Sequence, residues 1–164
     1  GRHCDLTARV ALAAGDEGVL FATGTQNSGI SMFVQGGRLV LDYNAFSEHT
    51  IIESDVELPL GEVELAVRLR RGEGMSGRAE IVVDGRVVGA ADLGLYMRMI
   101  SSVGSSIGYD AGPSVGGDHG SPVSQRYAAP YEFTGTLHEI VVQASPEKYA
   151  DVADAAGRAE MSRQ

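Results

Sequence analysis

The sequence of 164 residues has no tryptophan and only one cysteine, Cys4. A single cysteine excludes an internal disulfide, so the chain is not a disulfide scaffold of the kind found in small secreted proteins. It also has no run of about 18 apolar residues and no signal-peptide pattern. These absences favour a cytoplasmic protein. Because the chain opens at Gly1 without methionine, we expect a piece of a longer protein whose targeting information lies upstream.

Positive charge is also scarce. There are 13 basic against 22 acidic residues, and the net charge is −9. Binding to nucleic acid or to an anionic membrane depends on a basic surface, so this balance argues against both partners. The 43% of hydrophobic residues and the 22 glycines indicate one globular domain with many tight turns.

Alternation of apolar and polar side chains is the dominant pattern, and it is typical of strands with one buried face. Between residues 62 and 70, Val63, Leu65, Val67 and Leu69 fall on one face. A similar alternation puts Leu39, Leu41 and Tyr43 on the apolar face of the segment 38–44 and Asp42 on its polar face. We therefore expect half-buried antiparallel sheets with Tyr43 in the core.

Two short turns support this interpretation. Gly36-Gly37 and Asp84-Gly85 each separate two strand-like segments, and both pairs suit hairpin turns that need positive φ. Ten segments are predicted to be strands: 5–12, 19–23, 30–35, 38–44, 49–54, 62–70, 79–83, 86–90, 106–109 and 134–143. The expected fold is all-β, a two-sheet antiparallel sandwich or jelly roll.

Two segments depart from the strand pattern. Ser145-Pro146-Glu147 resembles the start of a helix, so we expect a β-sandwich over 1–145 and a short helical tail over 146–164. Residues 104–131 are rich in Gly, Ser and Pro and form a connection too long to be ordinary, and we expect any function of the domain there.

That long segment also carries a resemblance to a known family. The stretches GYD and DHGSPVSQRYAAPYEFTGTLHEIVV, preceded by GRHCDLTARV, GVLFATGTQNSGISMFVQGGRLVLDYNAF and GRAEIVVDGRVVG, resemble the C-terminal region of bacterial arylsulfatases, especially those of actinobacteria. The resemblance covers roughly residues 1–143 and implies a concanavalin-A-like or laminin-G-like sandwich appended to an alkaline-phosphatase-like catalytic domain. The sequence AGPSVGGD intervenes before His119, so either Asp110 or Asp118 could fill the family's turn-forming position.

The resemblance further implies a parent enzyme that uses calcium and a formylglycine made within a C/S-x-P-x-R signature. This chain has no such signature: Cys4 is not followed by the required proline, and Ser121-Pro122 and Ser145-Pro146 have the wrong spacing. We therefore expect no catalysis and no cofactor in this chain, with the nucleophile in the catalytic domain of the same protein.

Other catalytic centres find little support in the sequence. The four histidines, His3, His49, His119 and His138, are scattered and lack the spacing of a zinc-binding helix. Asp118, His119 and Ser121 contain the residue types of a catalytic triad, but they are neighbours on one loop and no G-x-S-x-G elbow accompanies them. Turn capping by Asp118 and Ser121 is the favoured interpretation.

Three roles for the long segment stay open. Asp110 and Asp118 could bind calcium, although no third carboxylate is nearby. A lectin-like glycan site could use tyrosines as stacking platforms, the candidates being Tyr43, Tyr109, Tyr127 and Tyr131. The preferred role is structural, with contact to the catalytic domain of the same chain or to a second copy in a homo-oligomer. The candidate interface residues are His119, Arg126, Tyr127 and Tyr131.

Overall fold

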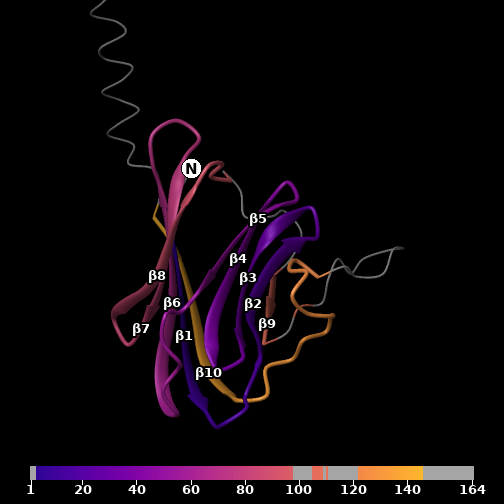
Figure 1. The fold of residues 1–164 in the computed structure, drawn as a ribbon, viewed down its shortest axis with the longest axis vertical. Helices are drawn as coiled ribbons and strands as arrows, with labels where there is room; N and C mark the ends of the chain where they lie inside the picture. The colour runs from indigo at the N-terminus through magenta and orange to yellow at the C-terminus, as the bar shows by residue number, and fades with distance from the viewer. Residues whose placement is uncertain (1–2, 98–104, 109, 111–121, 146–164) are drawn as a thin grey trace, which may run out of the picture.

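The computed structural model describes residues 3–97, 105–108, 110 and 122–145. These residues form ten strands in two five-stranded antiparallel sheets (Figure 1). The strands are β1 (Cys4–Leu12), β2 (Gly18–Thr25), β3 (Ser28–Gln35), β4 (Arg38–Ala45), β5 (Glu48–Glu53), β6 (Gly61–Arg71), β7 (Gly77–Val83), β8 (Arg86–Leu93), β9 (Ser105–Ile107) and β10 (Thr136–Ala144).

The sheets lie face to face as the two layers of a sandwich (Figure 1). The first sheet has the order β10-β1-β6-β7-β8, and the second has the order β5-β4-β3-β2-β9. This confirms the all-β, two-sheet antiparallel jelly roll predicted from the sequence. The predicted C-terminal helix over 146–164 lies outside the described residues.

The core fills the space between the sheets, and the period of two determines which side chains enter it. Alternate residues of β6, namely Val63, Leu65, Val67 and Leu69, are buried there as predicted. Tyr43 is also in the core, with only 2% of its surface exposed, and its hydroxyl accepts a hydrogen bond from Met97 N at 2.6 Å.

The hairpin turns follow the chemistry of their residues. Gly36 and Gly37 have φ of 59° and 74°, and Asp84 and Gly85 have φ of 47° and 82°, which confirms both predicted turns. A further hairpin connects β4 and β5 at 46–47, where Phe46 and Ser47 have φ of 52° and 69°. We did not predict this turn, because neither residue favours positive φ.

The two outer faces of the sandwich differ. On the first sheet, exposed cross-strand ion pairs such as Arg9–Glu139 and Arg78–Asp92 mark a solvent-facing surface. No helix among the described residues is long and apolar enough to cross a membrane.

The outer face of the second sheet is covered instead. Strands β2, β3 and β4 are buried on both sides. On this outer face Val19, Ala22, Phe33 and Val40 form a small cluster of their own, packed against two tyrosines of the segment 122–133. Our expectation of a half-buried sheet is therefore wrong for these strands. Asp42, expected on a polar solvent face, is fully buried.

Candidate functional site

The segment 122–133, called the strap below, crosses the outer face of the second sheet (Figure 1). Its C-terminal end is joined to the start of β2. Val19 N donates a hydrogen bond to Tyr131 O at 2.8 Å, and Val19 forms a parallel bridge with Glu132. Gly18 permits this approach, because a side-chain Cβ there would lie 2.1 Å from the backbone oxygen of Glu132.

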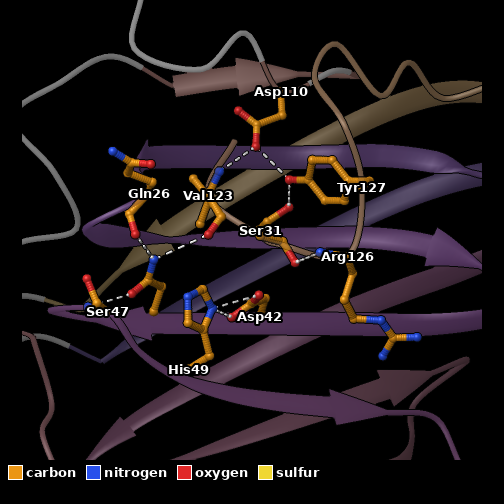
Figure 2. A network of polar contacts seen from close by, with 11 residues as sticks. Gln26, Ser31, Asp42, Ser47, His49, Asp110, Val123, Arg126 and Tyr127 are labelled. Carbon is orange, nitrogen blue, oxygen red and sulfur yellow. Dashed lines mark hydrogen bonds and ion pairs between the residues drawn. The ribbon is translucent and has the colours of Figure 1, made fainter. Parts of the chain in front are cut away.

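A buried carboxylate ties the strap to the sheet. Asp110 is 2% exposed, and its Oδ2 accepts hydrogen bonds from Val123 N at 2.9 Å and from the Tyr127 hydroxyl at 2.6 Å. The Tyr127 oxygen also lies 2.7 Å from Oγ of Ser31 on β3 (Figure 2). A buried polar chain of this kind is stable only when its members have partners. In the described part of the chain, no buried side-chain nitrogen or oxygen lacks one.

Aromatic packing reinforces the same attachment. The rings of Tyr127 and Tyr131 stack with centroids 4.9 Å apart, and the Tyr127 ring meets Phe33 edge-on at 5.0 Å. Burial raises the pKa of Tyr127 far above its ordinary value, and the hydrogen bond to Asp110 raises it further. Burial also raises the pKa of Tyr131 to about 12, with a hydrogen bond to Glu17 as the next cause. Both phenols are therefore protonated at neutral pH.

Arg126 attaches the strap to the sheet from its exposed side. Its guanidinium pairs with Glu53 at 2.5 Å and donates from Nε to Gln35 Oε1 at 3.1 Å, and Gln35 Nε2 donates back to Arg126 O at 3.0 Å. The ion pair is well exposed, with 33% of the Arg126 side chain and 44% of the Glu53 side chain accessible. Solvent screening therefore keeps the contribution of this ion pair to the free energy of unfolding small. Its main effect is to hold the strap in position.

A second polar group lies beside the strap on the same face. Nδ1 of His49 is 2.9 and 3.0 Å from the two carboxylate oxygens of the buried Asp42 (Figure 2). An oriented histidine becomes a catalytic base when a nucleophile lies within its reach. Among the described residues, no serine, threonine or cysteine side chain is hydrogen-bonded to a histidine.

A cleft of about 310 Å³ opens where the strap meets two hairpin turns. It is lined by Gln26, Asn27, Ser47, Pro122, Val123, Ser124 and Gln125. The buried side chain of Asn44 joins its walls: Nδ2 donates to Gln26 O at 2.7 Å and to Val123 O at 3.3 Å, and Oδ1 accepts from Ser47 N at 3.0 Å.

Sequence reasoning missed Asn44 and the β4–β5 turn, whose Ser47 lines the cleft. One signal was available. Only a few residues separate the predicted strands 38–44 and 49–54, which requires a tight turn, and Phe46-Ser47 is an unusual pair to occupy it.

The structure brings four of the predicted site residues together: Asp110, Arg126, Tyr127 and Tyr131 meet on the outer face of the second sheet. Their contacts in the structure are with their own domain, and the interface role stays a prediction. Asp118, His119 and Tyr109 lie outside the described residues. Within the described part, no group of three His, Cys, Asp or Glu side chains could hold a metal ion. The calcium role of Asp110 with Asp118 therefore also stays a prediction.

Comparison with protein-family models and with curated protein sequences found no match. Among solved structures, the chain is similar to the native heptameric SAP-like pentraxin from Limulus polyphemus, with 17% sequence identity and a TM-score of 0.50. The similarity covers 86% of this chain but only 63% of the pentraxin chain. At this level of identity the likeness concerns the fold alone, and it supports a sandwich of the concanavalin-A-like or laminin-G-like jelly-roll type.

Proposed function

We propose that this chain is a non-catalytic accessory β-sandwich of a larger arylsulfatase-type hydrolase, whose separate catalytic domain hydrolyses the sulfate ester. The observation that carries the proposal is the part played by the arylsulfatase-like segment GSPVSQRYAAPYEFTG. Its described residues, 122–135, contribute the contacts that hold the strap on the sheet. Use of these residues to hold the strap supports a structural role for the segment.

The chemistry of the strap supports the same role. The Tyr127 phenol is protonated at neutral pH and is engaged with Asp110 and Ser31. The guanidinium of Arg126 is paired with Glu53. A nucleophile or a general base needs a lone pair free to meet the substrate, and these groups are committed to intramolecular contacts.

A place for contact with the catalytic domain is suggested by the β9–β10 side of the sandwich. Ile107 pairs with Phe21, and Val142 pairs with Leu6, so both side chains lie on the core-facing side of their sheets. They are nevertheless 54% and 51% exposed, because they lie on edge strands at the margin of the core. Apolar surface at such an edge suits coverage by another domain of the same protein.

Deletion of the domain from the parent protein tests this proposal. Without residues 1–145, the parent is expected to melt at a lower temperature, while its turnover per folded molecule is kept. Val142→Asp should lower the melting temperature of the parent and leave that of this domain nearly unchanged. If the deletion abolishes turnover while the catalytic domain stays folded, the domain takes part in catalysis and the proposal is wrong.

A further inference from the structure

The outer face of the first sheet carries a patterned set of charges. Strands β1 and β6 pair there in a register that sets Asp5 beside Arg68, Thr7 beside Ala66 and Arg9 beside Glu64. The alternate residues of both strands, such as Leu6 and Leu65, are buried in the core, so these six side chains belong to the outer face. An acid and a base stand side by side at each end of this pattern, and their order is reversed between the two ends.

Arg68 is without an ion-pair partner among the described residues, although an acid flanks it on either side. Asp5 on β1 and Glu80 on β7 are its cross-strand neighbours. Asp5 is bound by Arg70 at 2.5 Å, and Glu80 lies 3.4 Å from Arg78. Because other arginines engage these two acids, the Arg68 guanidinium is available to a further carboxylate.

Glu64 is the matching acid of the same strand. It is exposed, and its backbone N–H donates to Asp84 Oδ1 at 2.9 Å, but in the described part of the chain its carboxylate has no hydrogen bond and no ion pair. Its cross-strand neighbour Arg9 pairs with Glu139 at 3.5 Å. Glu64 and Arg68 are about 13 Å apart along the strand, so they cannot pair with each other. Strand β6 therefore presents one acid and one base that are both available.

An uncharged row crosses the sheet between these two residues. From β10 to β8 it consists of Val141, Thr7, Ala66, Val82 and Val87. If a second copy were related by a two-fold axis in the plane of the sheet, each residue on the axis would face its own counterpart, and a charge there would repel itself. Along this row that penalty is absent.

Rotation about the uncharged row makes the face complementary to itself. The strands of a second copy then run antiparallel over those of the first, with Arg68 of each copy over Glu64 of the other and Arg9 over Asp5. A two-fold axis parallel to the strands would instead place Arg68 over Asp5, which Arg70 already binds. Rotation about the row is therefore the arrangement that pairs both available charges of β6.

We propose that this face binds a second copy of the chain, face to face, about the two-fold axis along the uncharged row. The first sheet is the layer opposite the one that the strap crosses (Figure 1). The face is also separate from the β9–β10 side, where contact with a catalytic domain is proposed. The dimer therefore does not depend on whether the domain belongs to an arylsulfatase.

The size of the face and the net charge both limit the strength of this dimer. Five strands about 4.8 Å apart, in contact over about 20 Å of their length, cover about 500 Å² per copy. A standard interface covers roughly 800 Å² per partner. Two chains that each have a net charge of −9 also repel each other. We therefore expect a dissociation constant on the order of 0.1 mM.

The test is sedimentation velocity of the full chain from about 10 μM to about 1 mM, at about 0.15 M salt, where distant charges are screened more than close pairs. Arg68→Glu and Glu64→Arg should each weaken association by about tenfold or more, because each places like charges opposite each other twice. An equimolar mixture of the two variants should form a heterodimer at least as tight as the native dimer. One chain then has acids at both positions of β6 and the other has bases, while their summed charge is that of two native chains.

Glu57→Arg is the matched control. Glu57 is exposed in the loop between β5 and β6, and its reversal changes the net charge as much as Glu64→Arg does. If net charge alone governed association, both variants would associate more tightly than the native chain; the proposed dimer is weakened only by Glu64→Arg. Circular dichroism confirms that each variant is folded. The proposal is overturned if the native chain is monomeric at about 1 mM, if Glu64→Arg associates as tightly as Glu57→Arg, or if the mixture stays monomeric.

Discussion

The hydroxyl of Tyr127 lies 2.6 Å from the carboxylate of Asp110, although neither residue belongs to a strand. This contact joins the strap to the segment after β9, and Ser31 extends it to the middle of the second sheet. The attachment of the strap therefore depends on a short buried polar chain, and its energetics can be tested residue by residue.

Removal of the Tyr127 hydroxyl is the first test of these buried hydrogen bonds. Tyr127→Phe keeps the aromatic packing on Phe33 and removes one hydrogen-bond donor from the buried Asp110, so it should lower the free energy of unfolding by about 2 kcal/mol. Ser31→Ala should cost about 1 kcal/mol. Because the two side chains share one hydrogen bond, the double variant should lose less than the sum. If the two losses measured by urea unfolding are additive, the Tyr127 and Ser31 hydroxyls are not energetically coupled, which would contradict this account.

Alkaline pH provides an independent test. Tyr43, Tyr96, Tyr127 and Tyr131 all have a raised pKa in the folded chain, with burial as the largest cause, and that of Tyr96 is raised to about 12. Above about pH 10 the unfolded chain ionises its tyrosines and the folded chain does not, so the free energy of unfolding should fall as the pH rises further. Phenolate absorbance at these residues should appear together with unfolding; full ionisation in the folded chain would contradict their burial.

The join between the strap and β2 can be tested at Gly18. Gly18→Ala places a Cβ against the backbone oxygen of Glu132 at φ 121°, and backbone atoms cannot move aside cheaply. We expect a loss of about 3 kcal/mol or a failure to fold. Gly36→Ala is the control, since Gly36 also has positive φ but has nothing within 4 Å, and it should cost only about 1 kcal/mol. Equal losses in the two variants would mean that the close approach at Glu132 does not matter.

The exposed contacts of Arg126 should contribute little. Arg126→Ala is expected to cost less than about 1 kcal/mol, because solvent screens its pair with Glu53. Hydrogen exchange at the Val123 amide separates the two kinds of attachment. It should stay slow in Arg126→Ala and accelerate in Tyr127→Phe, since the Asp110 carboxylate that accepts from this amide loses its phenolic partner. Fast exchange in Arg126→Ala would assign the attachment to the ion pair instead.

Much of the fold was predictable because local rules determine it. The alternation in 62–70 and the turns Gly36-Gly37 and Asp84-Gly85 each require only neighbouring residues, and all three agree with the structure. That the strap covers the outer face of the second sheet was harder to predict. Apolar side chains on both faces of Val19–Ala22 and around Phe33 were its signal, since a continuous apolar run indicates a strand buried on both sides.

The candidate site was only partly predictable. The segment 104–131 stood out by its composition, and Asp110, Arg126, Tyr127 and Tyr131 do lie together. Their partners Ser31, Gln35 and Glu53 are distant in the sequence and have no periodicity that links them to the strap. Asn44 was also hidden, because a polar residue at an outward position of a strand resembles a solvent-exposed one until something covers it.

The most direct test of the central claim is a sulfatase assay of this chain alone. Purified chain is incubated with an aryl sulfate such as 4-nitrophenyl sulfate, with and without calcium, at a concentration where the folded state is verified by circular dichroism. We predict release of the phenol at the rate of the protein-free blank under both conditions. Turnover above the blank that persists through further purification would contradict a non-catalytic accessory domain.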